Sequence, residues 1–264
     1  MLKERNRSKS SEIIKNTTIN EIIIHIKTIV YKKSSHYRQS LPKPAGFFAG
    51  ATLAGLKVIN ISVMVSGGGT NLQALIDGIE SGRIEGARIV LVLSSRDSAF
   101  ALERARKAGI KTIVISNEIY PDENEKADAI LAVLAEAETD LLITAGYMSI
   151  INKRVCTAYK GRMINIHPAL LPKYGGKGYY GIHVHRAVLA AGEKETGATV
   201  HYVDDEGIDS GEIILQKSIP VREDDTPETL QKRLLEEVEH KIIVEGTNMI
   251  VRKLNGKKPN AEKS

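Results

Sequence analysis

The sequence predicts an α/β fold in which helices cover both faces of a mostly parallel sheet. Three observations support this fold class. Short apolar runs rich in β-branched residues alternate with segments whose apolar residues recur at helical spacing. A glycine run separates the first strand from the first helix, and after residue 175 the alternation gives way to two successive apolar runs and one long amphipathic segment. Near-continuous apolar strands of this kind are typical of a parallel sheet buried between two helical layers.

The first part of the chain consists of repeated strand and helix units. The run KVINISVMVS predicts a strand over residues 57–66, and the helix after it has an apolar face formed by Leu72, Leu75, Ile76 and Ile79. Further strands are expected over residues 87–95, 111–116, 139–147 and 162–168. Further helices are expected over residues 99–109, 123–138 and 151–161. These units predict parallel strands joined by crossover helices.

A different pattern follows residue 175. A glycine-rich loop over 174–181 precedes a helix over 183–193, and the runs at 197–205 and 211–221 predict an antiparallel hairpin. Pro227, near the first helical turn, opens a long helix that ends near residue 254. The sequence therefore predicts a Rossmann-like, mostly parallel sheet with a late antiparallel hairpin and a long C-terminal helix.

Length and charge limit the classes of function. The 264 residues, 42% of them hydrophobic, suit one large domain or two small ones. Residues 1–57 contain eleven Lys and Arg against three Asp and Glu, whereas the other residues contain 26 against 29. The positive charge thus belongs to the N-terminal segment and does not predict that the folded part binds nucleic acid. No run approaches the ~20 apolar residues of a membrane span, so no membrane association is expected.

We divide the chain into an N-terminal extension (1–57), one folded domain (58–253) and a polar tail (254–264). The extension could be a targeting peptide, a disordered or partly helical segment, or an artefact of an upstream start codon. We favour a disordered segment or the artefact, because the extension lacks a cleavage site of the A-x-A kind. The single cysteine, Cys156, fits a reducing, cytoplasmic location and is expected to be a buried, inert thiol rather than a nucleophile.

The segment Ser66-Gly67-Gly68-Gly69-Thr70-Asn71 joins the first strand to the first helix. Glycines at such a turn let main-chain N–H groups converge, and the helix N-terminus adds positive potential, so an anion site is expected. Leu72 rules out the dinucleotide pattern G-x-G-x-x-G, and no Gly-Lys-Ser/Thr follows. The segment therefore predicts a site for a phosphate monoester. The alternative is a tight turn capped by Thr70.

Asn165, His167 and Pro168 lie where a predicted strand ends. Side chains of an extended segment repeat every second residue, so Asn165 and His167 project from the same face. A carboxamide can donate a hydrogen bond to a developing oxyanion, and an imidazole can move protons. This pair predicts acyl transfer. The alternative is that Asn165 caps a turn and His167 is a core histidine.

An acidic segment, Asp204 to Gly211, joins the two late strands. It lacks the spacing of an EF-hand loop, so calcium is not expected. Asp209 could instead reach back to His167, raise its pKa and fix its orientation. Three further histidines, His183, His185 and His201, are assigned structural or surface roles, since an H-x-H pair on a helix points its rings to different faces. No metal is predicted.

Taken together, four stretches resemble the folate-dependent glycinamide ribonucleotide formyltransferases of purine synthesis. They are ISVMVSGGGTNLQALID, AGYMSII, RMINIHPALLPKYGG and HYVDDEGIDSGEIILQ. The N-I-H-P-A-L-L-P run with the downstream aspartate loop is similar to formyl-tetrahydrofolate transferases and hydrolases. The run S-G-G-G-T-N-L-Q is similar to the glycinamide ribonucleotide branch. The resemblance covers roughly residues 58–253.

This resemblance implies a role for each matching residue. The phosphate of glycinamide ribonucleotide would contact Gly69, Thr70 and Asn71, and the ribonucleotide would also contact Glu236 and Glu239. The catalytic trio would be Asn165, His167 and Asp209. The co-substrate 10-formyltetrahydrofolate would be bound by Met148, Ser149, Ile150, Ile151, Asn165, Asp205, Glu206, Gly207, Ile208 and Asp209. No metal is required, and a monomer or homodimer is expected.

Three alternatives remain. A formyltetrahydrofolate hydrolase uses a similar trio with water as the acceptor, but usually carries an N-terminal regulatory domain that residues 1–57 do not match. A methionyl-tRNA formyltransferase would need a basic C-terminal domain, yet this sequence ends about ten residues after its last predicted helix. A non-catalytic Rossmann-like module would keep the glycine turn without needing Asn165, His167 and Asp209 together.

Overall fold

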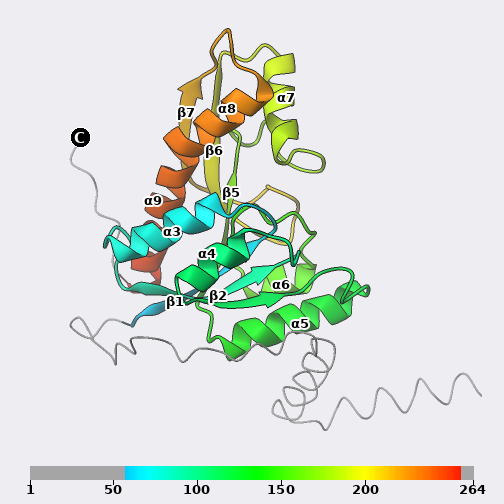
Figure 1. The fold of residues 1–264 in the computed structure, drawn as a ribbon, viewed down its shortest axis with the longest axis vertical. Helices are drawn as coiled ribbons and strands as arrows, with labels where there is room; N and C mark the ends of the chain where they lie inside the picture. Colours follow the sequence, from blue (N-terminus) through cyan, green and yellow to red (C-terminus); the bar gives the residue numbers. More distant parts are fainter. Residues whose placement is uncertain (1–56, 257–264) are drawn as a thin grey trace, which may run out of the picture.

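The computed structural model describes residues 57–256, which form a seven-stranded sheet in the order β3-β2-β1-β4-β5-β6-β7 (Figure 1). Strands β1 to β5 are parallel, and β6 and β7 are antiparallel additions. The strands are β1 Ile59–Val65, β2 Ala87–Ser94, β3 Lys111–Val114, β4 Leu141–Thr144, β5 Met163–His167, β6 Glu195–Tyr202 and β7 Ile213–Pro220. The predicted fold class is confirmed. The expected extension before Lys57 and the end of the expected tail lie outside the described residues.

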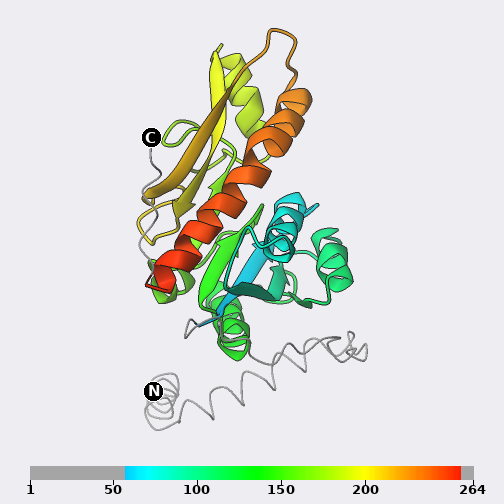
Figure 2. The same cartoon turned by 90° about the vertical axis from the view of Figure 1, so that its left-hand side faces the viewer.

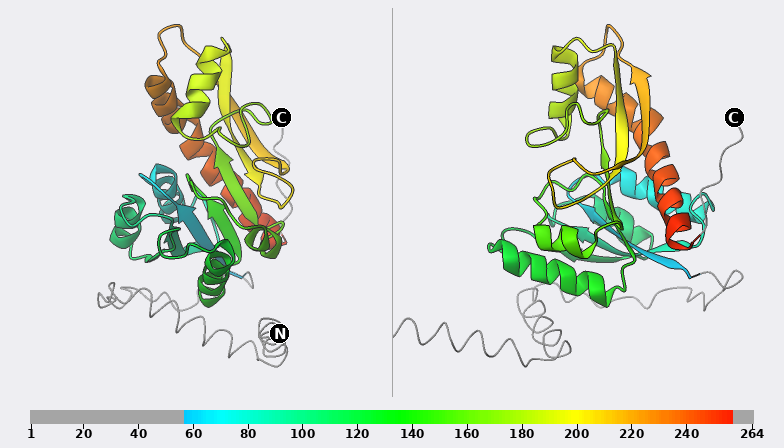
Figure 3. Two further views of the ribbon diagram at one scale, coloured as in Figure 1. Left: turned by 90° about the vertical axis from the view of Figure 1, so that its right-hand side faces the viewer. Right: turned by 180° about the vertical axis from the view of Figure 1, so that it is seen from behind.

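Helices cover both faces of the sheet, as expected from the apolar strands. They are α3 Thr70–Glu80, α4 Ala101–Lys107, α5 Glu123–Glu136, α6 Lys153–Ala158, α7 Ile182–Ala190, α8 Pro227–Leu234 and α9 His240–Leu254. Helices α3, α4 and α9 pack on one face, and α5 and α6 pack on the other (Figures 2 and 3). Helix α7 lies beside α8 at the end of the molecule that carries β6 and β7. Within residues 57–256, no helix is long and apolar enough to cross a bilayer.

Alternating side chains of the central strands feed two separate cores. Ile61, Val63 and Val65 of β1 pack under α3 and α9, whereas Met64 faces α5 and α6. This alternation follows from the two-residue period of a strand. The single thiol, Cys156 on α6, is buried, and burial raises the pKa of Cys156, which fits the expected inert role.

The register of the sheet brings distant residues into one row. Thr144 of β4 pairs with Asn165 of β5, and Asn165 pairs with His201 of β6. These three side chains therefore come from neighbouring strands at the same level of the sheet. The row lies at the carboxyl end of the parallel strands, where ligands bind in open α/β sheets.

The C-terminal helix differs from the single regular helix that the sequence predicts. Its hydrogen bonding widens to π-helical spacing over Leu235–Glu239, between α8 and α9. Such a wider turn accommodates one extra residue and often lies at a functional site. Here it buries Glu239 while Glu236 stays exposed. The difference could not be expected from apolar periodicity, because an insertion of one residue leaves no compositional mark.

Candidate functional site

The glycine turn after β1 leaves the N-terminus of α3 uncapped by any side chain. The N-cap residue is Gly69, with a φ of 72°, so the alternative of a Thr70 cap is wrong. Within the described part of the chain, a Cβ atom at Gly67 or Gly68 would meet nothing within 4 Å, whereas one at Gly69 would lie 2.5 Å from the Cβ atom of Ala101. Main-chain N–H groups at a helix N-terminus attract anions. The turn thus faces open space with the groups that a phosphate needs.

Two of the predicted substrate contacts touch each other beside this turn. The Asn71 amide Nδ2 donates to Oε2 of Glu239 at 2.9 Å, and both side chains are buried. Burial raises the pKa of Glu239 to about 7, although the bond from Asn71 opposes this shift. Oδ1 of Asn71 is buried and has no hydrogen-bond partner among residues 57–256. This pair therefore holds an unused acceptor and a weakly acidic carboxyl near the turn.

The structure adds a cation that sequence reasoning missed. Arg104, on α4, donates from Nε to the carbonyl of Gly68 at 2.9 Å and from Nη1 to Oε1 of Gln73 at 3.2 Å. The guanidinium therefore holds the glycine turn and adds positive charge beside it. No local signal marks Arg104, because Arg106 and Lys107 of the same helix are equally basic in the sequence.

Asn165 lies at the centre of the acyl-transfer cluster, which we define as Thr144, Asn165, His167, His201 and Asp209. Its Oδ1 accepts a hydrogen bond from the Thr144 hydroxyl at 2.7 Å. Its Nδ2 lies 3.1 Å from Nε2 of His201 and 3.4 Å from Oδ1 of Asp209. The acceptors on the other side, Nε2 of His201 and the Asp209 carboxylate, fix which end of the amide is the nitrogen. The amide N–H groups consequently face the space between β5, β6 and the aspartate loop.

His167 is buried between two acceptors. Its Nε2 lies 2.8 Å from the carbonyl oxygen of Tyr174, so this nitrogen carries the proton, and its Nδ1 lies 3.4 Å from Oδ2 of Asp209. Burial lowers the pKa of His167, even though Asp209 and Tyr174 favour the charged ring. Asp209 favours a higher pKa, as expected, but desolvation outweighs the carboxylate and the net shift is downward. The resting imidazole is neutral near pH 7, with Nδ1 available for a proton.

Asp209 reaches the two histidines from a strained turn. Its φ is 58°, in a region that residues with a side chain seldom adopt, and the main-chain N–H of Gly176 donates to its Oδ2 at 3.0 Å. Burial alone would raise the pKa of Asp209, but interactions with His201, His167 and Gly176 hold it below its usual value. Asp209 is thus an anion between two imidazoles, as the sequence predicted for one of them.

His201 is the member of the cluster that the structural or surface assignment missed. Its Nδ1 lies 2.9 Å from the carbonyl oxygen of Tyr202, so Nδ1 carries the proton and Nε2 accepts from Asn165. Nε2 also lies 3.6 Å from Oδ1 of Asp209. The other two histidines behave as expected from their spacing on α7, since His183 is exposed and His185 is buried. Only the pairing of β5 with β6 could have revealed His201, and only the pairing of β4 with β5 could have revealed Thr144.

The residues expected to bind the folate lie on two loops. The segment Met148 to Ile151 follows β4 and is tied to the glycine turn, because the Met148 N–H donates to the Ser66 hydroxyl at 2.8 Å. Met148 and Ile150 are 45% and 74% exposed, which is unusual for large apolar side chains and suits a surface that a ligand covers. On the aspartate loop, Ile208 is also exposed. The Asp205 carboxylate instead pairs with Lys153 at 3.3 Å, and Glu206 and Gly207 are exposed.

Comparison with known proteins identifies the family. Residues 59–247 match the family described as formyl transferase. The chain belongs to this formyl transferase family.

Two relatives within the formyl transferase family are named phosphoribosylglycinamide formyltransferase. A phosphoribosylglycinamide formyltransferase of Haemophilus influenzae is 38% identical over 177 residues, which are 67% of this chain and 80% of that protein. A chloroplastic phosphoribosylglycinamide formyltransferase of Arabidopsis thaliana is 40% identical over 186 residues, which are 70% of this chain and 63% of that protein. The trifunctional purine biosynthetic protein adenosine-3 of Drosophila pseudoobscura pseudoobscura is 43% identical over 175 residues. This formyl transferase chain spans only 12% of that protein.

Solved structures of formyl transferases share the fold. Glycinamide ribonucleotide transformylase 1 from Symbiobacterium toebii aligns with a TM-score of 0.70 and 37% identity, over 80% of this chain and 94% of that chain. The phosphoribosylglycinamide formyltransferase from Coxiella burnetii aligns with a TM-score of 0.68 and 38% identity, over 75% of this chain and 89% of that chain. The formyl transferase fold therefore accounts for the described part of the chain.

Proposed function

We propose that the protein transfers the formyl group of 10-formyltetrahydrofolate to the amino group of glycinamide ribonucleotide, a step of purine biosynthesis. The observation that carries the proposal is the acyl-transfer cluster. A carboxamide, two imidazoles and a carboxylate meet at the carboxyl edge of the sheet, and the Ser66–Met148 hydrogen bond links the glycine turn to the loop expected to bind folate. The names of the relatives from Haemophilus influenzae and Arabidopsis thaliana support the same activity.

In this proposal Asn165 stabilises the oxyanion. The substrate amine attacks the formyl carbon, and the carbonyl oxygen gains negative charge. One N–H of Asn165 is held by His201, and the other has only a long, 3.4 Å contact to Asp209, so it can turn to the new oxyanion. Losing a donor of this kind typically costs about 10²–10³ in rate.

His167 moves the proton in the same proposal. The attacking amine loses a proton as its bond to the formyl carbon forms. Because Nε2 of His167 is already protonated and bound by Tyr174, Nδ1 is the nitrogen that accepts this proton. Asp209, 3.4 Å away, stabilises the imidazolium. The imidazolium then returns the proton to N10 of the folate as the bond between carbon and N10 breaks.

The glycine turn binds the ribonucleotide in this proposal. The uncapped N-terminus of α3 and the Arg104 guanidinium supply N–H donors and positive potential for the phosphate. Asn71, which is bonded to Glu239, supplies a polar atom for the phosphate, and Glu239 supplies one for another part of the ribonucleotide. The net negative charge of residues 58–264 does not oppose this, because the phosphate responds to nearby N–H groups.

One assay with the purified protein tests the proposal and its alternatives. Release of tetrahydrofolate from 10-formyltetrahydrofolate is measured with glycinamide ribonucleotide, with water alone, and with methionyl-tRNA. We expect turnover only with the ribonucleotide. Turnover with water alone would indicate a hydrolase, turnover with methionyl-tRNA the tRNA enzyme, and no turnover at all a non-catalytic module.

Three further expectations stay predictions. A chelator should leave turnover unchanged if no metal takes part. Sedimentation should distinguish the monomer from the homodimer, and a tagged full-length chain should test the cytoplasmic location.

A further inference from the structure

A buried ammonium without an ionic partner lies beside the expected folate loop. Lys126, on α5, is only 5% exposed. Its Nζ donates to Oδ1 of Asn117 at 2.7 Å and to the hydroxyl of Ser149 at 2.6 Å. An ammonium has three N–H donors, so one of them is unused. No Asp or Glu among residues 57–256 forms an ion pair with Lys126.

An unpaired buried charge of this kind is costly. Buried lysines are almost always paired, because removing the ammonium from water disfavours its charged form. Burial accordingly lowers the pKa of Lys126, and Glu123, one turn away on α5, only partly offsets this. A negatively charged ligand would supply the missing partner.

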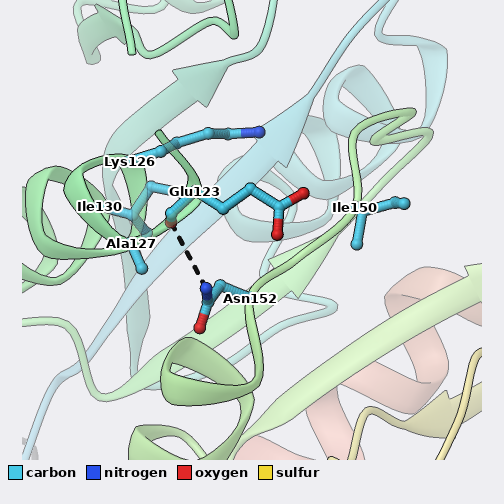
Figure 4. A pocket seen from close by; sticks show the side chains of 6 residues that line it. All are labelled: Glu123, Lys126, Ala127, Ile130, Ile150 and Asn152. Carbon is cyan, nitrogen blue, oxygen red and sulfur yellow. Dashed lines mark hydrogen bonds between the residues drawn. The ribbon is translucent and has the colours of Figure 1, made fainter. Parts of the chain in front are cut away.

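Lys126 also lines a small pocket at the surface, and apolar side chains line the same pocket. The pocket is formed by Glu123, Lys126, Ala127, Ile130, Ile150 and Asn152 (Figure 4). Figure 4 shows the Lys126 and Glu123 side chains extending from α5 in the direction of Ile150. Ile150 is 74% exposed. An apolar surface next to an unpaired cation fits a ligand with an aromatic body and an anionic end.

We propose that Lys126 binds a glutamate carboxylate of the folate donor. This inference rests on the proposed function, because it takes 10-formyltetrahydrofolate as the ligand. The donor carries an aminobenzoyl ring between its pterin and its glutamate. The exposed side chains of Met148 and Ile150 cover this ring, and the unused N–H of Lys126 donates to the carboxylate. Ser149, which is bonded to Lys126, couples the ammonium to the loop that holds the ring.

The decisive comparison uses two donors that differ only in charge. One is 10-formyltetrahydrofolate, and the other is its diamide, in which both glutamate carboxylates are replaced by carboxamides. In the Lys126→Met variant we expect KM for the natural donor to rise about ten- to a hundredfold, as for the loss of one hydrogen bond to a charged group. KM for the diamide and KM for glycinamide ribonucleotide should change less than about twofold.

Two further variants control for structure and for the neighbouring acid. Lys111→Met removes an exposed lysine that pairs with Glu136 of α5, and it should leave every KM unchanged. Glu123→Gln removes the carboxylate that lines the same pocket, and it should lower KM for the natural donor by about two- to threefold. The melting temperature of Lys126→Met should stay close to that of the wild type, because loss of the hydrogen bonds to Asn117 and Ser149 is offset by removal of a buried charge that has no ionic partner in the described part of the chain.

Several outcomes would overturn the inference. An equal rise of KM for the natural donor and the diamide would mean that Lys126 only shapes the loop through Ser149. An unchanged KM for the natural donor would mean that the ammonium binds no carboxylate. If the wild type transfers no formyl group, tetrahydrofolate binding is measured by calorimetry instead. Weaker binding of tetrahydrofolate by Lys126→Met than by the wild type would then support the inference, although the proposed function would have failed. No binding by the wild type, or equal binding by the two proteins, would reject the inference.

Discussion

The two ends of the candidate site are built from different parts of the polypeptide. The glycine turn is one run of six consecutive residues, Ser66 to Asn71, at the junction of β1 and α3. The acyl-transfer cluster consists of side chains from β4, β5, β6 and the aspartate loop, which meet only in the folded sheet. One end is local in sequence, and the other is assembled over about 65 residues from Thr144 to Asp209.

This difference determines how each end tolerates change. The glycine turn depends on the absence of side chains, so substitutions that add a side chain should impair it. Its glycines have no side-chain atoms to remove. The cluster depends on hydrogen bonds between specific side chains, so removing one atom leaves several buried partners unsatisfied. Substitutions at the cluster should therefore lower kcat, and substitutions at the turn should raise the KM for one substrate.

The largest effect is expected at the centre of the cluster. Asn165→Ala and His167→Ala should each lower kcat by about 10²–10³ or more, because each removes a group that acts only in the transition state. Steady-state kinetics and a thermal melt of each variant test this. His183→Ala, which removes an exposed histidine of α7, is the matched control and should retain full activity. Near-normal turnover of either cluster variant would reject the proposed mechanism.

A smaller loss is expected at the residue that sequence reasoning missed. His201→Ala should lower kcat roughly ten- to a hundredfold, as is typical when a group that orients a reacting side chain is lost. Thr144 still holds the other end of the Asn165 amide, so the loss is partial. His201→Gln retains an acceptor and should recover part of the rate. If His201→Ala raises only KM, the side chain contacts substrate rather than positioning Asn165.

At the glycine turn, substitutions at two neighbouring residues can separate an effect on substrate binding from an effect on stability. Gly68→Val should raise KM for glycinamide ribonucleotide about tenfold with little change in melting temperature, because a Cβ atom there meets no protein atom within 4 Å. Gly69→Ala should instead lower stability by roughly 1–3 kcal/mol, because its φ is 72° and Ala101 is too close. Equal rises of KM for both substrates in Gly68→Val would indicate a purely structural turn.

The last effect is a change in how stability, rather than turnover, depends on pH. Because the pKa of Glu239 is raised to about 7 in the folded protein, its folded form binds a proton that the unfolded chain releases near pH 4.5. The stabilising contribution of this proton is complete below pH 4.5 and is lost as the pH rises to about 7. Glu239→Gln should remove this loss, which amounts to at most about 3.5 kcal/mol at ~1.4 kcal/mol per pKa unit between 4.5 and about 7.

Denaturant unfolding at pH 5 and pH 8 measures this difference. The stability of the Glu239→Gln variant relative to the wild type should be higher at pH 8 than at pH 5. Glu236→Gln, on the same turn but exposed, should show the wild-type dependence. Parallel curves for all three proteins would mean that Glu239 is ionised in the fold at both pH values.

The glycine turn could be predicted from the sequence, whereas the acyl-transfer cluster could be predicted only in part. Strand and helix periodicity, the glycine turn and the Asn165–His167 spacing depend on neighbouring residues, so composition and spacing record them. His201 and Thr144 join the cluster through strand register, which no single segment encodes. Arg104 reaches Gly68 from the next helix, and the net pKa direction of His167 depends on burial. These contributions arise from tertiary packing.

The π-helical turn at Leu235–Glu239 gives the C-terminal helix one residue more than regular α-helical spacing would hold. Each residue of an α-helix corresponds to a rotation of about 100° about the helix axis. The turn holds Leu230 and Leu234 of α8 and Ile242 and Ile243 of α9 against the body of the protein in one continuous rod. Loss of a single residue at exposed Glu236 or Glu237 would therefore return the turn to regular α-helical spacing and leave α8 and α9 in the same register. Gain of a further residue at the same position would instead rotate α9 by about 100° and turn Ile242 and Ile243 away from the core. This exposed position should therefore tolerate a deletion better than an insertion.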